Sequence, residues 1–380
     1  MNFVSVRQLL TKSERGSSVH RPWWHYLHID MPLLTGLLLI AAVGLLILYS
    51  AGGQNMGIIT RQCLHLGVAL LVMFGFAQIP PSTYQRWAPL IFFLGITLLM
   101  LVLVAGHRGK GASRWLNLWI FRFQPSEIMK IAIPLFLAWY CHRIQLPLSG
   151  RHLFIAATLM LIPAVLTAKQ PDLGTAILQL AAGGSVLLLA GMSWYLLSSL
   201  IIAGAAASPF IWHLLHDYQK KRILTFLNPE RDPLGAGYHI IQSKIAIGSG
   251  GLFGKGWMHG TQSNLHFLPE HSTDFIFAVC GEEWGLVGNL IIITLYMMVV
   301  LRGLQITVSA QDTFSRLLAG SLTLTFFVSF FTNAGMVTGI LPVVGLPLPL
   351  ISYGGSSMVT LMAGFGILMS IRTHRKLLTT

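Results

Sequence analysis

Long apolar runs and short polar segments alternate along the chain. A helix needs about 20 mostly apolar residues to cross the roughly 30 Å of hydrocarbon in a bilayer, and ten runs approach that length. They lie near residues 32–50, 58–78, 88–105, 125–141, 153–168, 173–190, 194–214, 275–301, 316–340 and 353–371. The pattern therefore predicts an all-α integral membrane protein, a bundle of about ten transmembrane helices with one large extracytoplasmic loop at 217–273.

The composition agrees with a membrane protein. Hydrophobic residues make up 54% of the chain and charged residues only 10%, whereas a soluble domain carries roughly 25% charged residues. The first apolar run is longer than the core of a cleaved secretion signal, which has about 7–15 residues, and a second run follows closely. We therefore expect the first run to stay in the protein as a membrane span.

Basic residues give the expected orientation. The segment before the first run carries Arg7, Lys12, Arg15 and Arg21, and cytoplasmic segments are enriched in such residues. An even number of spans returns the chain to the same side, so both termini are expected in the cytoplasm. The predicted divisions are a cytoplasmic segment at 1–30, a membrane domain at 31–371 and a cytoplasmic tail at 372–380.

Positive charge is also abundant on the expected outer side. In this orientation the inner and the outer segments each carry 12 Lys and Arg residues, and six of the outer ones lie in the 217–273 loop. An anionic ligand at the outer face would account for the surplus. The alternative is that these side chains only reach toward lipid phosphates.

The sequence of the long loop predicts a short helix followed by a glycine-rich stretch. Ile240, Ile241 and Ile245 fall on one face of a helix expected at 238–247. Five glycines follow between 248 and 256, flanked by Lys244 and Lys255. Glycine lets a ligand approach the backbone closely, so we favour a phosphate-contacting surface there. A flexible turn region is the alternative.

Asp274 stands where this loop meets the eighth apolar run. Holding a carboxylate at a membrane surface costs desolvation free energy, so Asp274 is a candidate functional residue. Asp is also a favoured N-cap, and capping of the next helix is the alternative. Further along the run, we expect Glu282 and Glu283 to serve structural pairing rather than chemistry.

A second polar pair opens the fourth apolar run. Glu127 and Lys130 are three residues apart, which places acid and base on one helical face. They should face the bundle interior, either as an internal ion pair or as part of a ligand site. The motifs of nucleotide-driven transport, zinc hydrolysis and serine hydrolysis are missing from the sequence, and nothing indicates a nucleic-acid partner.

Several segments resemble one known family. The segment NAGMVTGILPVVGLPLPLISYGGSS at 333–357 is similar to the signature of the SEDS family (shape, elongation, division and sporulation). The family is also matched by FQPSE at 123–127, QPDLG at 170–174 and DFIF at 274–277. DPLGAGYH at 232–239, GKGW at 254–257 and GTQS at 260–263 resemble its elongation branch more than its division branch. The resemblance covers nearly everything after about residue 30.

The resemblance implies a peptidoglycan glycosyltransferase that polymerises lipid II at the outer face of the cytoplasmic (inner) membrane during lateral wall synthesis and rod-shape maintenance. The implied partners are a class B penicillin-binding protein, which crosslinks the glycan, and other membrane proteins of the elongation complex. Asp274 matches the family and would be the general base. The family usually has His directly before the Thr-Asp pair, where this chain has Ser272, with the His displaced to His271.

The residues expected to bind the pyrophosphate of lipid II are Lys130 with Glu127, Arg114, Arg122, Lys244 and Lys255. A divalent cation, Mg or Mn, is a possible helper, and no organic cofactor is expected. Two other functions remain as alternatives, a lipid II flippase and a non-catalytic activator of a partner transpeptidase. A flippase would gather its charges around a midplane cavity, and an activator has no need of an acid beside phosphate-binding cations.

Overall fold

The computed structural model describes residues 27–105, 107–109, 112–117, 122–214, 217–231, 236–264, 267 and 270–374. Its helices are α2 (Met31–Ala51), α3 (Met56–Gln78), α4 (Pro81–Ala105), α5 (Pro125–His142), α6 (Gly150–Lys169), α7 (Leu173–Leu189), α8 (Trp194–Ala206), α9 (Ser208–Leu214), α10 (Asp217–Leu227), α11 (Ala236–Gly250), α12 (Thr261–Asn264), α13 (Ile276–Val308), α14 (Thr313–Thr338) and α15 (Ser356–Thr373), with a 3-10 turn at Pro229–Arg231.

Each predicted apolar run coincides with helix, which confirms the helical membrane fold. Among the described residues, seven helices are long and apolar enough to cross a membrane by length and composition: α2, α3, α4, α6, α13, α14 and α15. The run at 194–214 is divided between α8 and α9. These helices make the chain a multi-pass membrane protein.

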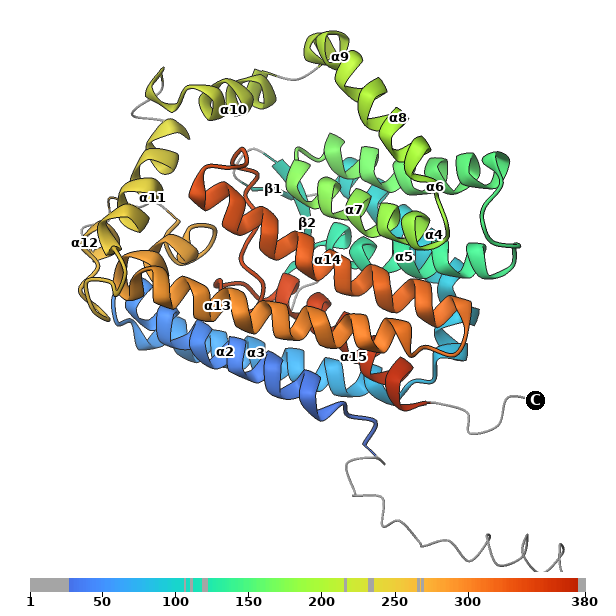
Figure 1. Ribbon diagram of the computed structural model, residues 1–380, viewed down its shortest axis with the longest axis horizontal. Helices are drawn as coiled ribbons and strands as arrows, with labels where there is room; N and C mark the ends of the chain where they lie inside the picture. Colours follow the sequence, from blue (N-terminus) through green and yellow to red (C-terminus); the bar gives the residue numbers. More distant parts are fainter. Residues whose placement is uncertain are drawn as a thin grey trace, which may run out of the picture.

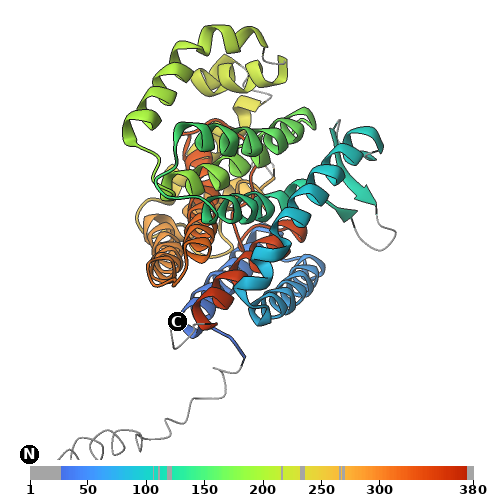
Figure 2. The same ribbon diagram turned by 90° about the vertical axis from the view of Figure 1, so that its right-hand side faces the viewer.

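One small sheet departs from the all-helical prediction. Strands β1 (His107–Gly109), β2 (Ala112–Asn117) and β3 (Arg122–Phe123) pair antiparallel in the order β1-β2-β3 between α4 and α5. His107 pairs with Trp115, and Leu116 pairs with Phe123. Figure 2 shows the sheet at the periphery of the helix bundle. Strands this short carry too little hydrophobic alternation for a sequence pattern to predict them.

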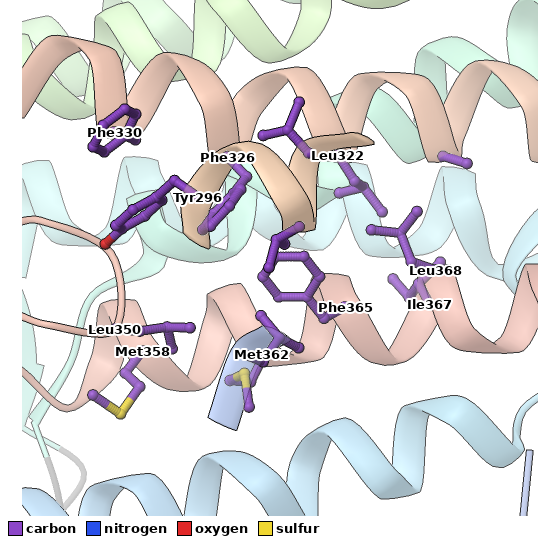
Figure 3. Packing of buried hydrophobic residues seen from close by; sticks show 14 of the residues in the cluster. Tyr296, Leu322, Phe326, Phe330, Leu350, Met358, Met362, Phe365, Ile367 and Leu368 are labelled. Carbon is purple, nitrogen blue, oxygen red and sulfur yellow. The ribbon is translucent and has the colours of Figure 1, made fainter. Parts of the chain in front are cut away.

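Helix α14 lies at the centre of the bundle, where it contacts α13, α5, α7, α11 and α15 (Figure 1). Its apolar window is 72% buried, against 17% for α3. Figure 3 shows the packing between α14 and α15, where the Phe326 and Phe365 rings meet edge to face at 5.0 Å. Tyr296 of α13 stacks on Phe330 at 4.3 Å, and its hydroxyl donates to the Pro349 carbonyl. That bond ties the loop between α14 and α15 to the core.

Helix α13 is broken at Gly285, which has φ 66° and ψ −157°. The segment 251–256 fills the break with four backbone hydrogen bonds of 3.0–3.1 Å. Lys255 and Gly256 donate to the carbonyls of Glu282 and Glu283, while Leu286 and Val287 donate to Gly251 and Leu252. The backbone groups that the break would leave unpaired are thereby satisfied.

Glycines in and next to that segment allow this contact. A Cβ on Gly250 would lie 2.0 Å from the Gly281 carbonyl oxygen, and one on Gly254 would lie 2.1 Å from that of Glu283. These two glycines lie against the backbone of α13, and the predicted phosphate contact at this segment stays a prediction. The predicted helix exists as α11, although its buried face is formed by Ile240, Ser243 and Ala246 while Ile245 is 45% exposed.

Candidate active site

Asp274 lies in a turn at 270–275 that precedes α13. The helix begins at Ile276, with Phe275 at the N-cap position and no side-chain cap bond. The interpretation of Asp274 as the N-cap is therefore wrong. The turn begins at Glu270, which has a φ of 52°, and the Glu270 carbonyl accepts from the backbone N–H groups of Thr273 and Phe275 at 3.1 and 3.3 Å.

Asp274 lines a cavity of about 470 Å³, a size that suits part of a large substrate. The wall is formed by the 270–275 turn, by α5, α7, α14 and α15, and by the loop 339–355 between α14 and α15. Leu322, Phe326, Met358 and Phe365 line its apolar side, which continues into the packed core of Figure 3. The cavity thus joins a charged end to an apolar interior.

Glu127 and Lys130 line the same cavity as Asp274. Their side chains form an ion pair, with 2.6 Å between Lys130 Nζ and Glu127 Oε2. Glu127 follows Pro125, which begins α5, so both side chains are fixed at the first turns of that helix. The pair offers the cavity one cation whose charge is balanced by its neighbour.

Two further carboxylates line the cavity that sequence reasoning did not single out, Asp172 and Glu270. Asp172 caps α7, accepting from the Thr175 N–H at 3.4 Å, and it also accepts from Gln124 Nε2 at 2.8 Å. The Glu270 carboxylate accepts from the Thr273 hydroxyl at 3.0 Å. The signal that revealed Asp274, a carboxylate beside the start of an apolar run, could have found both.

The described structure does not place the other predicted phosphate ligands at the cavity. Arg114 and Arg122 lie on β2 and β3, but their side chains fall outside the described part of the structure. Lys244 and Lys255 are not among the cavity-lining residues. Lys244 is exposed on α11 and lies against Gly339, where α14 ends. For these four residues, pyrophosphate binding stays a prediction.

Lys255 has a structural partner. Its ammonium lies 2.7 Å from the Glu282 carboxylate, which is fully buried. The same carboxylate accepts from the N–H and hydroxyl of Thr261 and from the N–H of Gln262 at 2.8–3.2 Å. Glu283 accepts from the Ser50 hydroxyl. The prediction that Glu282 and Glu283 serve structural pairing agrees with these contacts.

His239 of α11 borders the turn from the side of the long loop. Its ring stacks on Phe275 with 5.8 Å between centroids and 14° between planes. Burial lowers the pKa of His239 below its ordinary value of 6.5, and the negative charge of Glu270 opposes that shift. The neutral ring is therefore favoured at the start of α13.

The described residues contain no group of three or more His, Cys, Asp or Glu side chains placed to hold a metal ion. Carboxylate and carbonyl oxygens are the ligands that Mg²⁺ and Mn²⁺ prefer, and the carboxylates of the cavity wall do not form such a cluster. A divalent cation therefore stays a prediction.

A family model and individual relatives place the chain in the same family. A family model described as a cell cycle protein family of FtsW, RodA and SpoVE matches residues 25–377. Peptidoglycan glycosyltransferase MrdB of Escherichia coli K12 is 53% identical over 360 residues, covering 94% of this chain and 97% of the relative. Peptidoglycan glycosyltransferase RodA of Treponema pallidum is 33% identical, covering 91% of this chain and 98% of the relative.

Solved structures agree. A chain from a peptidoglycan synthase complex, described as coordinating polymerization and crosslinking, matches with a TM-score of 0.80 and 33% identity over 92% of this chain and 98% of that chain. The rod shape determining protein RodA of Thermus thermophilus matches with a TM-score of 0.69 and 27% identity, over 91% of this chain and 98% of that chain. The chain belongs to the FtsW, RodA and SpoVE family of membrane proteins.

Proposed function

We propose that this peptidoglycan glycosyltransferase polymerises lipid II in the cavity beside Asp274, with Asp274 as the general base. The observation that carries the proposal is that Asp274, Glu127 and Lys130 all line one cavity with an apolar interior. That combination suits a substrate with a sugar, a pyrophosphate and an isoprenoid tail. The relatives named peptidoglycan glycosyltransferases support the same reaction class.

The chemistry is one displacement at a sugar carbon. Asp274 accepts the proton of the acceptor hydroxyl. The oxygen of that hydroxyl attacks C1 of the donor sugar. The bond between C1 and the pyrophosphate oxygen breaks, and undecaprenyl pyrophosphate leaves with the electron pair. A positioned general base contributes about 10²–10⁴-fold to such a step.

The leaving pyrophosphate needs positive charge near it. Lys130 is the predicted cationic ligand that the described structure places on the cavity wall, and stabilising developing charge is its proposed role. Its ion pair with Glu127 holds the ammonium in place. No step depends on a metal ion.

The location and partners follow from the same proposal. The enzyme would lie in the cytoplasmic membrane with both termini inside and the cavity open to the outer face. Its partner would be a class B penicillin-binding protein that crosslinks the product, alongside other elongation-complex membrane proteins. The structural match to a peptidoglycan synthase complex that coordinates polymerization and crosslinking supports this assignment.

The test separates glycosyl transfer from lipid transport. Translocation needs a sealed bilayer, whereas glycosyl transfer does not. We expect the purified protein to make uncrosslinked glycan from lipid II in detergent micelles, together with a penicillin-binding partner whose transpeptidase is blocked by a β-lactam. Absence of polymer there, with Asp274-dependent movement of lipid II in sealed vesicles, would replace the polymerase with a flippase.

A further inference from the structure

Asn333 is a fully buried amide in the central helix α14. Polar side chains inside membrane helices are costly unless they are hydrogen-bonded or functional. The Nδ2 group of Asn333 donates to the Asp274 carbonyl at 2.8 Å and to the Leu346 carbonyl at 2.7 Å. Its Oδ1 atom has no hydrogen-bond partner among the described residues. The described polar contacts of this side chain therefore join two backbone segments.

The first of these segments is the turn that carries Asp274. Three consecutive carbonyls of the turn accept hydrogen bonds from outside it: Ser272 from the Tyr353 N–H at 2.9 Å, Thr273 from the Ser352 hydroxyl, and Asp274 from Asn333. Because Ser272 takes part through its carbonyl, this contact does not require the His that the family usually has there. The turn is therefore held from outside through the backbone carbonyls of Ser272, Thr273 and Asp274.

The second segment is the loop 339–355, which forms the facing wall of the cavity. Leu346 follows Gly345, and a Cβ on Gly345 would lie 3.5 Å from Asp274 Oδ2. Asn333 therefore joins the backbone of Asp274 to the stretch of loop that its carboxylate faces. Asn333 is not among the residues that line the cavity, so its amide acts from behind the wall.

We propose that Asn333 is a positioning residue for Asp274, and that its two hydrogen bonds fix the distance between the Asp274 carboxylate and the cavity wall at Gly345 and Leu346. The inference rests on the proposed role of Asp274 as general base. A base must lie within hydrogen-bond reach of the proton it accepts, and a misplacement of about 1 Å can cost about 10²-fold in rate.

The primary test is Asn333→Ala, measured as polymer formed per folded molecule. We expect kcat to fall by about 10–100-fold, while KM for lipid II stays within about threefold, because the side chain positions the base and does not touch the substrate. The matched control is Ser321→Ala in the same helix. Ser321 is fully buried and donates to the Ala182 carbonyl, so its loss weakens α14 packing away from the turn and should leave kcat unchanged.

A double variant separates positioning from general stability. In an Asp274→Asn background, Asn333→Ala should cause little further loss, since the group that it positions no longer acts as a base. An equal loss in both backgrounds would overturn the inference. So would a normal kcat for Asn333→Ala when Asp274→Asn is inactive. Near-normal polymerisation by Asp274→Asn alone would instead remove the base role and this inference with it.

Asn333→Ala could lose folded protein, because two buried hydrogen bonds are removed. Ser352→Ala then tests the same positioning of the turn, since the Ser352 hydroxyl donates to the Thr273 carbonyl, next to that of Asp274. Its kcat should fall in the wild-type background and change little beside Asp274→Asn. A loss independent of Asp274 in this variant would also overturn positioning through the turn.

Discussion

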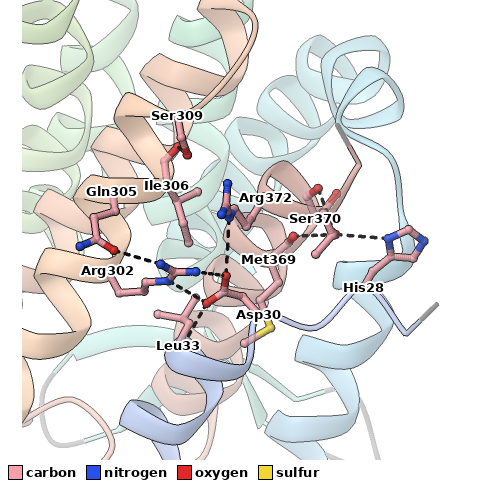
Figure 4. Close-up of polar contacts among 11 residues, drawn as sticks. His28, Asp30, Leu33, Arg302, Gln305, Ile306, Ser309, Met369, Ser370 and Arg372 are labelled. Carbon is pink, nitrogen blue, oxygen red and sulfur yellow. Dashed lines mark hydrogen bonds and ion pairs between the residues drawn. The ribbon is translucent and has the colours of Figure 1, made fainter. Parts of the chain in front are cut away.

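Two carboxylates near opposite ends of α13, Asp30 and Asp274, are held in contrasting ways. Asp30 caps α2 and accepts from the Leu33 N–H at 3.1 Å, and Arg302 donates to both of its oxygens at 3.0 and 2.7 Å. Arg372 of α15 lies 3.9 Å away, so the cluster in Figure 4 joins α2, α13 and α15. Both carboxylate oxygens of Asp30 thus contact the protein.

The backbone carbonyl of Asp274 accepts from Asn333, and its carboxylate lines a cavity. The difference teaches how to distinguish a structural acid from a candidate catalytic one in this bundle. Asp30 and Glu282 form ion pairs that join separate segments of the chain, and neither lines the cavity. A catalytic acid needs its position fixed from behind while its oxygens face the substrate.

The largest effect is expected at Asp274. Asp274→Asn keeps the size of the side chain and the backbone anchor but removes the proton acceptor, so polymerisation per folded molecule should fall by about 10²–10⁴-fold. Membrane insertion and melting temperature should stay close to those of the wild type. Near-normal polymerisation by the purified variant would make Asp274 a structural acid like Asp30.

The corresponding substitution near the opposite end of α13 is Asp30→Asn. It leaves Arg302 without its carboxylate partner, and breaking such a mostly buried pair costs about 3–5 kcal/mol in general. Because Arg302 is 23% exposed, we expect a loss near the lower bound. Thermal unfolding in detergent should show the destabilisation, while turnover per folded molecule stays unchanged. A selective loss of turnover would contradict the contrast between the two acids.

Two of the three predicted phosphate-binding lysines extend the comparison. Lys130→Met removes a cation from the cavity wall, and turnover should fall toward the lower end of the roughly 10²–10³-fold range seen when one charge-stabilising group is lost. Lys255→Met should lower stability instead, because it removes a partner of the buried Glu282 carboxylate. Assays per folded molecule with melting curves distinguish the two. Normal turnover in folded Lys130→Met would leave only a structural ion pair with Glu127.

The smallest effect concerns His239. Its pKa is lowered in the folded protein by burial, so the unfolded chain binds more protons as the pH falls below about 6.5. Stability is therefore full above that pH and declines as the pH falls toward the folded pKa. His239→Gln should remove this part of the acid sensitivity in melting curves recorded between pH 7.5 and 5.5. An identical pH dependence in the variant would show that protonation of His239 is not coupled to folding.

The sequence alone determined the helices of the membrane domain and the residue at the centre of the candidate site. Apolar length is a local property, because a helix in lipid satisfies its backbone hydrogen bonds internally, so the runs could be placed without knowing their neighbours. Glu127 and Lys130 could be paired for the same reason, since three residues along a helix fix one face. Asp274 emerged because a charge beside an apolar run is unusual wherever the helix packs.

Only the tertiary structure decided what surrounds these residues. The glycines at 250 and 254 meet the break in α13, Lys255 meets Glu282, and Asn333 joins Asp274 to Leu346 across 59 and 13 positions of sequence. Such contacts depend on how helices distant in sequence are packed together. The same residue types can bind phosphate or stabilise the fold, so the sequence identified them as candidates and only the structure showed their burial and neighbours.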